Sequence, residues 1–400
     1  MQSVLISGAG IAGPALAFWL KAAGFEPTIV ERTPTLRSGG YVIDFWGLGY
    51  DLAERMGLIE EINRIGYHVR EVRIVDEAGN RVAGFGTNVF SELTGGRFVT
   101  LPRSALSRLL FGKVKASIDT VFGDEVIGIE QQADGVRVAL AHAGERRFDL
   151  LIGADGLHSQ VRKLAFGPHS LFEKHLGYAV AAFEASDYRP RDEDAYLMYG
   201  EPGRMLGRFT LRDNRALFLF VFAANDLPDS LEGQKALLRD LYGRGGWECK
   251  HALNEMDRTD ELYFDSVSQI TMQNWSHGRV ALVGDAAFCV SLLAGQGSAL
   301  AMIAAYVLAG ELNASHGRYQ QAFACYEARL RSYIETKQRG AERFARALAP
   351  RTRAGLRFRN LVIDAFAIPG IAKLAVGRNI ADRIELPGYQ WPTLDGFSAA

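Results

Sequence analysis

A strand, a glycine-rich turn, a helix and a second strand follow one another in residues 4–32, and this pattern constrains the fold more than any other stretch. The apolar runs at 4–6 and 28–30 predict two buried parallel strands. Between them the turn Gly8-Ala9-Gly10-Ile11-Ala12-Gly13 opens a helix expected over 14–23. In such a turn the first two glycines let the backbone approach a pyrophosphate, and the third lets helix and strand pack closely. The helix N-terminus supplies free N–H groups for the phosphates.

The second strand ends in an acidic residue, Glu31, followed by Arg32. An acid at this place accepts hydrogen bonds from the ribose of a bound dinucleotide. An ordinary glycine-rich turn between a strand and a helix is the structural alternative. Because strand, turn, helix, strand and acid all occur in order, the sequence predicts a dinucleotide-binding domain.

Length and composition narrow the remaining possibilities. Four hundred residues are long for one core and favour two domains with a helical appendage. A net charge of −1 argues against nucleic acid as a partner, and the apolar stretches 292–312 and 361–376 contain residues that argue against a membrane span. The cysteines, Cys249, Cys289 and Cys325, have no metal-binding or redox spacing, and the first strand leaves no room for a targeting segment. We therefore expect a cytoplasmic protein.

Two further motifs each follow an apolar strand. Residues 148–152 lead into Gly153-Ala154-Asp155-Gly156, and the helix expected after it should fix Asp155 near the nucleotide. Residues 279–283 lead into Gly284-Asp285-Ala286-Ala287, and Gly295-Gln296-Gly297 then opens a long helix. A dinucleotide needs only one phosphate-binding turn, so a second turn indicates a cofactor with another electron-rich end. FAD fits, because a helix N-terminus would stabilise the negative charge that reduced isoalloxazine carries near N1. A capped helix and a chance glycine turn are the structural alternatives.

The pattern changes between residues 178 and 222. Aromatic-rich strands expected over 178–184, 195–199, 205–210 and 216–222 predict an antiparallel sheet and therefore a second domain. Most of its aromatic side chains should lie in the core, and a minority should line a substrate pocket at the domain boundary. Side chains alternate along a strand, so only one face can look into that pocket. The pocket candidates are Phe45, Met198, Arg208, Phe209, Phe220 and Leu293.

Taken in order, the motifs at 8–13, 153–156 and 284–287 resemble the fingerprints of the FAD-dependent aromatic hydroxylases, which are monooxygenases of the para-hydroxybenzoate hydroxylase fold. The resemblance covers about residues 1–340, and within the family the chain looks most like the tetracycline-inactivating flavin monooxygenases. It implies an α/β fold: a Rossmann-like FAD-binding domain with an inserted antiparallel β-sheet substrate domain and C-terminal helices. The implied FAD-binding domain is discontinuous (1–66, 96–170 and 276–340), the substrate domain takes 67–95 and 171–275, and a helical segment and tail take 341–400.

The resemblance also assigns ligands. NAD(P)H would be the co-substrate, served by the Asp155 motif without a separate domain, and no metal site is expected. The residues expected to bind FAD are Gly8, Gly10, Ala12, Gly13, Glu31, Arg32, Arg103, Val126, Asp155, Asp285, Gly295, Gln296 and Gly297.

The implied activity is hydroxylation of an aromatic or polycyclic small molecule by O2 through a C4a-hydroperoxyflavin. The flavin carries the chemistry, so no protein catalytic residue is assigned. Phe288 and Leu292 stand where the family has His and Pro, and we expect oxygenation that is imperfectly coupled to NADPH consumption. The absence of a Trp-x-Trp-x-Ile-Pro pattern argues against a halogenase. A peroxide-producing flavin oxidase or reductase and a flavin- or nucleotide-sensing interaction protein remain as alternatives, and either a monomer or a dimer is expected.

Overall fold

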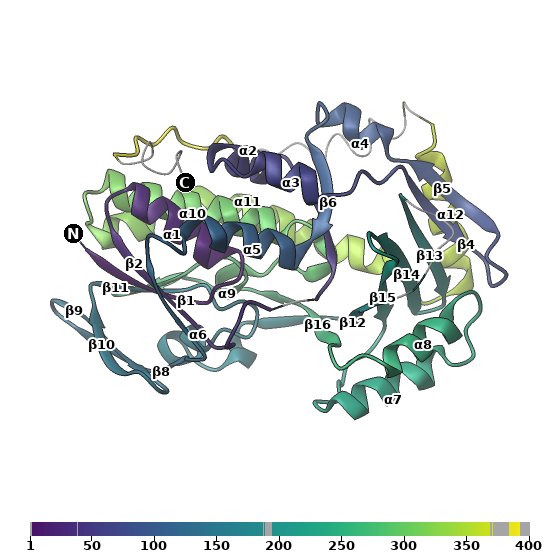
Figure 1. The fold of residues 1–400 in the computed structure, drawn as a ribbon, viewed down its shortest axis with the longest axis horizontal. Helices are drawn as coiled ribbons and strands as arrows, with labels where there is room; N and C mark the ends of the chain where they lie inside the picture. Colours follow the sequence, from purple (N-terminus) through teal and green to yellow (C-terminus); the bar gives the residue numbers. More distant parts are fainter. Residues whose placement is uncertain are drawn as a thin grey trace.

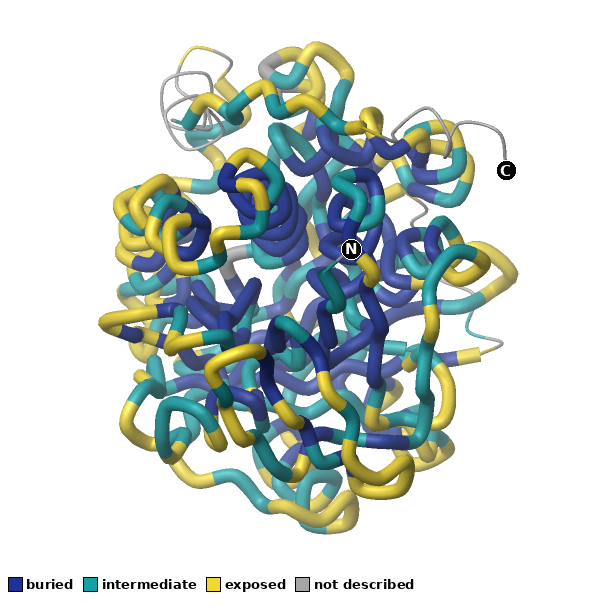
Figure 2. Tube along the Cα trace, turned by 90° about the vertical axis from the view of Figure 1, so that its left-hand side faces the viewer, coloured by how far each residue is buried: buried dark blue, intermediate teal, exposed yellow. Residues whose placement is uncertain are grey.

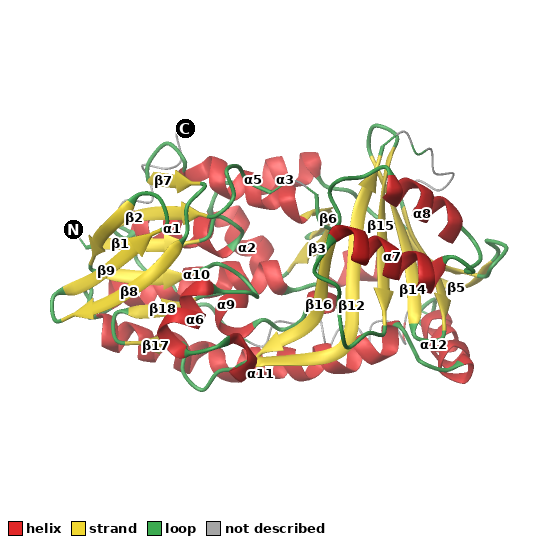
Figure 3. Ribbon diagram, turned by 90° about the horizontal axis from the view of Figure 1, so that it is seen from below, coloured by secondary structure: helices red, strands yellow, loops and turns green. Residues whose placement is uncertain are grey.

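The computed structural model describes residues 2–37, 39–186, 188, 194–368, 370 and 384–392. An α/β part built on a parallel sheet lies at one end of the molecule and a large, mostly antiparallel sheet lies at the other (Figure 1). The long helix α11 (Tyr319–Leu348) contacts α10 of the α/β part and β12 of the large sheet. Seen from below, it runs along the edge of the molecule beneath both parts (Figure 3).

The α/β part contains a six-stranded sheet in the order β17-β18-β11-β1-β2-β7. The three motif strands are adjacent and parallel in it, and their residues are almost wholly buried, as the apolar runs predicted. The strands are β1 (Ser3–Ser7), β2 (Glu26–Glu31), β7 (Asp119–Phe122), β11 (Leu150–Gly153), β17 (Ser276–His277) and β18 (Val280–Leu282). Because parallel strands end at the same edge, the three motifs that follow β1, β11 and β18 are brought together.

Helices pack on this sheet and on one another, and the tube in Figure 2 shows that the centre of the molecule is buried. They are α1 (Ala12–Ala22), α2 (Leu48–Arg55), α3 (Ile59–Ile65), α5 (Arg103–Val114) and α10 (Gly297–Ala314). By length and hydropathy α10 could cross a membrane, but 78% of it is buried inside this protein, where it packs on α1. A small antiparallel sheet and one further helix complete this part: β8 (Val126–Gln132), β9 (Gly135–Leu140), β10 (Gly144–Phe148) and α6 (Gln160–Phe166).

The large sheet has seven strands in the order β16-β12-β15-β14-β13-β4-β5. The strands are β4 (Glu71–Val75), β5 (Arg81–Gly86), β12 (Glu173–Ala185), β13 (Ala195–Glu201), β14 (Arg204–Leu211), β15 (Arg215–Phe222) and β16 (Tyr263–Ile270). The early hairpin β4–β5, which lies in the segment 67–95 that the resemblance assigned to the substrate domain, joins this sheet by pairing β4 in parallel with β13. A two-stranded sheet, β3 (Val42–Trp46) and β6 (Phe98–Pro102), lies between the large sheet and α10.

The two faces of the large sheet have different partners. The face that we call the helix face packs Phe218 and Phe220 against α7 (Leu231–Tyr242) and α8 (Cys249–Asp257). The opposite, inner face carries Tyr196, Met198 and Phe209, which register places on one side. Four short elements complete the described chain: α4 (Asn88–Leu93), the 3-10 turns His169–Leu171 and Leu292–Ala294, and α9 (Asp285–Phe288).

Two pocket candidates are corrected by this alternation. Arg208 and Phe220 lie on the helix face, where Arg208 forms an ion pair with Glu248 and the ring of Phe220 packs on Tyr242 at 4.8 Å between centroids. Both side chains therefore point away from the α/β part. The sequence had placed them on the right strands, but which face turns inward is decided by where α7 and α8 pack.

The C-terminal region ends in α12 (Arg353–Ala365) and a tail described over 384–392. The tail packs on the α/β part, since Trp391 packs on Trp19 of α1 at 4.8 Å and the Tyr389 hydroxyl donates to Glu311 of α10 at 2.5 Å. Much of the helical segment expected within 341–400 lies outside the described residues, which omit 369, 371–383 and 393–400.

Candidate active site

The three glycine motifs touch one another at the carboxyl edge of the six-stranded sheet. Gly8 has φ of +109°, and a Cβ there would lie 2.6 Å from the Ala154 carbonyl oxygen. Gly284 has φ of +64°, and its Cβ would lie 3.1 Å from the Cβ of Ala12. A Cβ on Gly13 would overlap the carbonyl oxygen of Gly8. The glycines are thus required by close backbone packing, which holds the three turns as one rigid unit.

Glu31 lies directly beside the first turn. Its Oε2 accepts a hydrogen bond from the Ala9 N–H at 2.8 Å, and its Oε1 accepts from the Thr33 N–H and hydroxyl at 3.0 and 2.8 Å. The carboxylate is therefore held at the edge of the turn, where the sequence predicted a ribose contact. The neighbouring Arg32 is exposed.

Arg103 lies over the same turn and faces Asp285. Its Nη2 is 4.0 Å from the position that a Cβ on Gly10 would take, and its backbone N–H donates to the Tyr41 carbonyl at 3.0 Å. Burial acts to lower the pKa of Arg103, but the charges of Tyr41 and Asp285 outweigh it and raise that pKa. Burial raises the pKa of Asp285, and Arg103 opposes that shift. Arg103 and Asp285, both half-buried, are thus close enough for the charge of each to affect the pKa of the other.

The second turn meets this pair at the start of α10. Gly295 has φ of +67°, and a Cβ there would meet no atom within 4 Å, so the turn borders open space. A Cβ on Gly297 would lie 3.7 Å from Oδ1 of Asp285, and Gln296 is the N-cap residue. The N-terminal end of α10 therefore presents its positive dipole next to Asp285 and to this space.

The Asp155 motif is tied to its own helix. The carboxylate accepts from the Gln160 and Val161 N–H groups at 2.8 and 3.0 Å and from the Ser159 hydroxyl at 2.5 Å, so it caps α6. Burial, opposed by these hydrogen bonds, raises its pKa. The fixing of the acid by the following helix is confirmed, while its contact with a nucleotide stays a prediction.

The remaining predicted residues take varied places. Val126 is fully buried at the start of β8, and Phe45 is 1% exposed and packs near Gly49 and α10. Leu293 packs with Met205 and Val221 of the inner face. Phe288, which replaces the family's histidine, points into the core and packs on Trp275 at 4.7 Å, so it does not shape the space beside Gly295.

Sequence reasoning missed Tyr41, Tyr263 and Cys289. The rings of Tyr41 and Tyr263 meet at 5.6 Å, and both groups lie close enough to Arg103 to affect its pKa. Cys289 follows the motif at 284–287 by two positions, so its nearness to the site was visible in the sequence. Nothing local showed that β16 would bring Tyr263 to this place.

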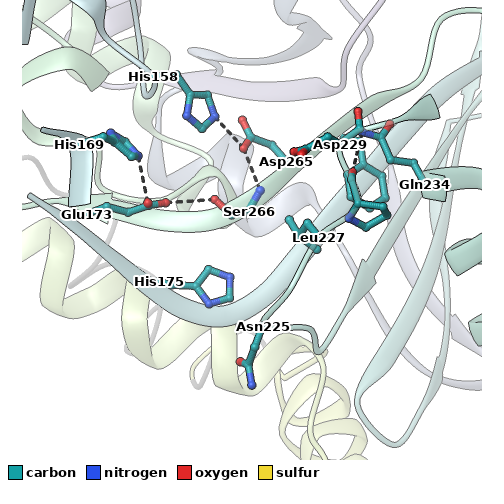
Figure 4. A pocket seen from close by; sticks show the side chains of 12 residues that line it. His158, His169, Glu173, His175, Asn225, Leu227, Asp229, Gln234, Asp265 and Ser266 are labelled. Carbon is teal, nitrogen blue, oxygen red and sulfur yellow. Dashed lines mark hydrogen bonds and ion pairs between the residues drawn. The ribbon is translucent and has the colours of Figure 1, made fainter. Parts of the chain in front are cut away.

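A separate pocket of about 450 Å³ is lined by His158 and His169, which follow the Asp155 motif in the chain, and by residues of β12 and β16 (Figure 4). In it Nε2 of His158 is 3.0 Å from Oδ1 of Asp265, and Nε2 of His169 is 3.0 Å from Oε2 of Glu173. The hydrogen bond that His158 donates to Asp265 raises the pKa of His158, whereas burial lowers that of His169. Asp265 also affects the pKa values of Tyr41 and Asp285, so it borders both the pocket and the buried site. Among the described residues, no His, Cys, Asp or Glu cluster could hold a metal ion.

The site as a whole suits FAD. The first turn is open over Gly10 except for the Arg103 guanidinium, Glu31 offers acceptors to a ribose, and the helix end at Gln296 faces open space. Arg103 and Asp285 supply a cation and an acceptor between these two ends. A long ligand with an adenosine end, a pyrophosphate and a flat electron-rich end would find a partner at each part.

Comparison with known protein families agrees with this geometry. The model of a family described as "FAD binding domain" matches residues 1–337. An uncharacterized protein of Mycobacterium tuberculosis is 40% identical over 347 residues, which cover 84% of this chain and 92% of that protein. A flavin-dependent monooxygenase of Legionella longbeachae is 35% identical over 349 residues, covering 84% and 87% of the two chains.

Solved structures show the same fold. The tetracycline destructase Tet(51) superposes with a TM-score of 0.81 at 31% identity, covering 97% of this chain and all of that one. HpxO of Klebsiella pneumoniae, solved with FAD and uric acid, superposes with a TM-score of 0.78 over 95% of both chains. Because the identity to HpxO is only 22%, this similarity supports the fold alone.

Proposed function

Because this chain belongs to the FAD-dependent monooxygenases of the para-hydroxybenzoate hydroxylase fold, we propose that it uses NAD(P)H and O2 to hydroxylate an aromatic or polycyclic small molecule. The observation that carries the proposal is the meeting of Arg103, Asp285 and the Gln296 helix end around an open turn, opposite an apolar sheet face. The chemistry that FAD would supply when bound is the transfer of reducing equivalents from NAD(P)H to O2, from which one oxygen atom would go to the substrate.

The chain's own residues would bind and orient the cofactor. Glu31 accepts from the adenosine ribose, the turn at 8–13 binds the pyrophosphate, and Asp285 accepts from the linker toward the flavin. Arg103 neutralises nearby phosphate charge. The N-terminal end of α10 stabilises negative charge on the ring system without moving during the reaction.

The substrate would lie between the turn at 295–297 and the inner face of the large sheet. Leu293 packs directly on that face, and Met198 and Phe209 belong to it. Apolar side chains there would exclude water, which protects a reactive oxygen species from collapse to peroxide. The proposal also includes the domain boundaries given above. It places the protein in the cytoplasm, as a monomer or a dimer.

The test begins with the purified protein. It should be yellow, heat should release FAD, and Asp285→Asn should lower FAD occupancy while Asp119→Asn, at an exposed strand position, should not. A screen of aromatic compounds for stimulated NADH or NADPH consumption, with product masses, then tests the reaction. If peroxide accounts for all the reductant with every compound, the enzyme is an oxidase. If the protein takes up no FAD, the proposal fails altogether.

A further inference from the structure

The outer face of α12 exposes large apolar side chains to solvent. The helix packs its other face on β5 and β13, where Leu356 and Arg359 lie 3.4 and 3.0 Å from the place that a Cβ on Gly200 would take. On the outer face Phe358 is 69% exposed and Leu361 is 68% exposed. A surface helix of a globular protein normally turns polar side chains to water, so a second apolar face marks an interaction site.

The exposed apolar side chains form a stripe along α12, and arginines flank it. Phe358, Leu361 and Val362 stand at positions i, i+3 and i+4, which share one side of a helix, and Val362 is also exposed. Arg353, Arg357 and Leu361 are spaced by four residues, so the two arginines, both exposed, border the stripe. The outer face of this helix is therefore apolar and basic at once.

The end of α11 adds positive charge to the same edge of the molecule. Seen from below, α11 and α12 follow one another along this edge (Figure 3). Arg343 and Arg346 are exposed near the end of α11, and Phe344 between them is 49% exposed. Between residues 339 and 359 the chain carries seven arginines and one acidic residue, Glu342, although the whole chain has a net charge of −1. Positive charge is thus concentrated where the apolar side chains are exposed.

These side chains together make what we call the C-terminal surface. Its members are Arg343, Phe344, Arg346, Arg353, Arg357, Phe358, Leu361 and Val362. Within the described part of the chain, no acidic side chain forms an ion pair with any of its four arginines. A solvated charged face would explain the arginines, but it would leave the exposed Phe358 and Leu361 without a reason.

We propose that the C-terminal surface binds an anionic phospholipid bilayer. The guanidinium groups pair with lipid phosphates, and Phe358 and Leu361 enter the boundary of the acyl chains. Because α12 has 13 residues and is held against the sheet, it lies in the plane of the interface and does not cross the bilayer. Protruding apolar side chains suit a fluid surface, which needs no pocket complementary to them. Charge complementarity supplies the rest of the binding.

Docking would bring the inner face of the large sheet toward the bilayer. Gly200, against which α12 packs, alternates with Met198 and so lies on that face. Ala345 and Ala349 of α11 pack in the cluster that contains Met205 and Leu293. The two helices of the C-terminal surface therefore cover the side of the sheet that we assign to the substrate. The binding of lipid is independent of the proposed reaction and stands or falls without it.

The experiment measures co-sedimentation of the full-length, FAD-loaded protein with lipid vesicles. One set of vesicles is phosphatidylcholine alone, and the other contains about 30% phosphatidylglycerol. At about 0.1 M salt we expect the wild type to partition at least about tenfold more strongly onto the anionic vesicles, and about 0.5 M salt should weaken this binding.

Two double variants separate the charged and apolar contributions. Arg353→Gln/Arg357→Gln and Phe358→Ser/Leu361→Ser should each lower the partition coefficient on anionic vesicles by about tenfold. FAD content and melting temperature show that each variant is folded.

Matched controls change the same residue types elsewhere on the molecule. Arg64→Gln/Arg108→Gln removes exposed arginines of α3 and α5, and Leu171→Ser removes a leucine that is 68% exposed, as Leu361 is. Both controls should bind anionic vesicles as the wild type does. Equal losses in controls and variants, or equal binding to neutral and anionic vesicles, would overturn the proposal.

Failure of the wild type to bind anionic vesicles would also overturn it, because the surface would then serve another occupant. Light scattering identifies one such occupant: a dimer that Phe358→Ser/Leu361→Ser converts to a monomer, in a protein that ignores vesicles, would assign the C-terminal surface to a second copy of the chain.

Discussion

The guanidinium of Arg162 donates from Nη1 to the carbonyl oxygen of Ala286 at 2.8 Å, and so joins the second glycine motif to the third. Its Nη2 donates to the Leu157 carbonyl at 2.5 Å and lies 2.5 Å from Nδ1 of His169. The arginine is fully buried, and burial lowers its pKa. This side chain of α6 thus holds two turns of the site in place.

Replacing this arginine should destabilise the whole α/β part. Arg162→Met leaves buried carbonyl groups without donors, so we expect the free energy of unfolding to fall by about 2–4 kcal/mol. Arg162→Lys cannot supply all three contacts and should recover only part of the loss. Urea denaturation measures both. Arg137→Met, which removes an exposed pair with Glu130, should cost less than about 1 kcal/mol. Equal losses at the two positions would contradict the account.

The third glycine of the first turn should tolerate no side chain. A methyl group at Gly13 would collide with the Gly8 carbonyl, so Gly13→Ala should lose most bound FAD and melt at a lower temperature. Gly112→Ala is the matched control, because Gly112 lies in α5 with no atom within 4 Å of its would-be Cβ. In a helix that change should be neutral or stabilise by up to about 1 kcal/mol. Full FAD occupancy in Gly13→Ala would show that the turn is looser than its geometry indicates.

The free energy of unfolding should depend on pH through the titration of Asp44. Its pKa is about 6 in the folded protein, raised above the ordinary value of 3.8, so the folded state favours the protonated form. Protonated Asp44 therefore contributes to the free energy of unfolding in full below pH 3.8, and this contribution is lost as pH rises through 6. Relative to Asp44→Asn, the wild type should lose on the order of 2 kcal/mol between pH 4 and pH 7.5. Unfolding free energies of both proteins across that range measure the difference, and a pH-independent difference would contradict it.

The His158–Asp265 pair in the surface pocket should also make the stability of the protein depend on pH, in this case through a histidine. Asp265 raises the pKa of His158, so their interaction stabilises the folded protein below about pH 6.5 and is lost as pH rises through the folded-state pKa. Glu173 supports the charged form, and Arg162 and the desolvation of the ring oppose it. Asp265→Asn should lower the His158 pKa, which a proton NMR titration of the imidazole would show. An unchanged value would mean that the pair is not formed in solution.

Leu292 should affect oxygen use more than cofactor binding. It lies between Asp285 and the turn at 295–297 and packs in the cluster that contains Met198 and Leu293. Leu292→Pro should change the ratio of product to NADPH consumed, with peroxide assayed in parallel, and should leave FAD affinity within about threefold of wild type. Leu171→Ala, at a position 68% exposed, is the control. A large loss of FAD with an unchanged ratio would assign Leu292 to the cofactor site instead.

The sequence predicted the three motifs well because each depends on local geometry. A glycine such as Gly8 is needed wherever φ is positive and another backbone lies close, and short apolar runs before the turns mark the buried strands. The end of each strand could therefore be placed to within a few residues.

Contacts between distant segments could not be predicted in the same way. Alternation puts Phe209 and Phe220 on opposite faces, but only the packing of α7 and α8 decides which face turns inward. Asp44 is one polar residue in an aromatic strand, and its place beside Thr100 and Tyr196 appears only when the small sheet lies across the large one. The parallel pairing of β4 with β13 joins residues more than 100 positions apart, for which no local signal exists.

The strand order of the six-stranded sheet also determines when this sheet can form while the chain is being synthesised. β1 leaves the ribosome first, yet its neighbour β11 begins at Leu150, and β18, which continues the sheet, begins at Val280. Until then the nascent chain exposes an apolar strand edge, and early edges of this kind invite aggregation. Such non-local pairing also slows folding. Recombinant yield should therefore depend strongly on growth temperature and on chaperone capacity, even for variants whose finished fold is as stable as the parent's.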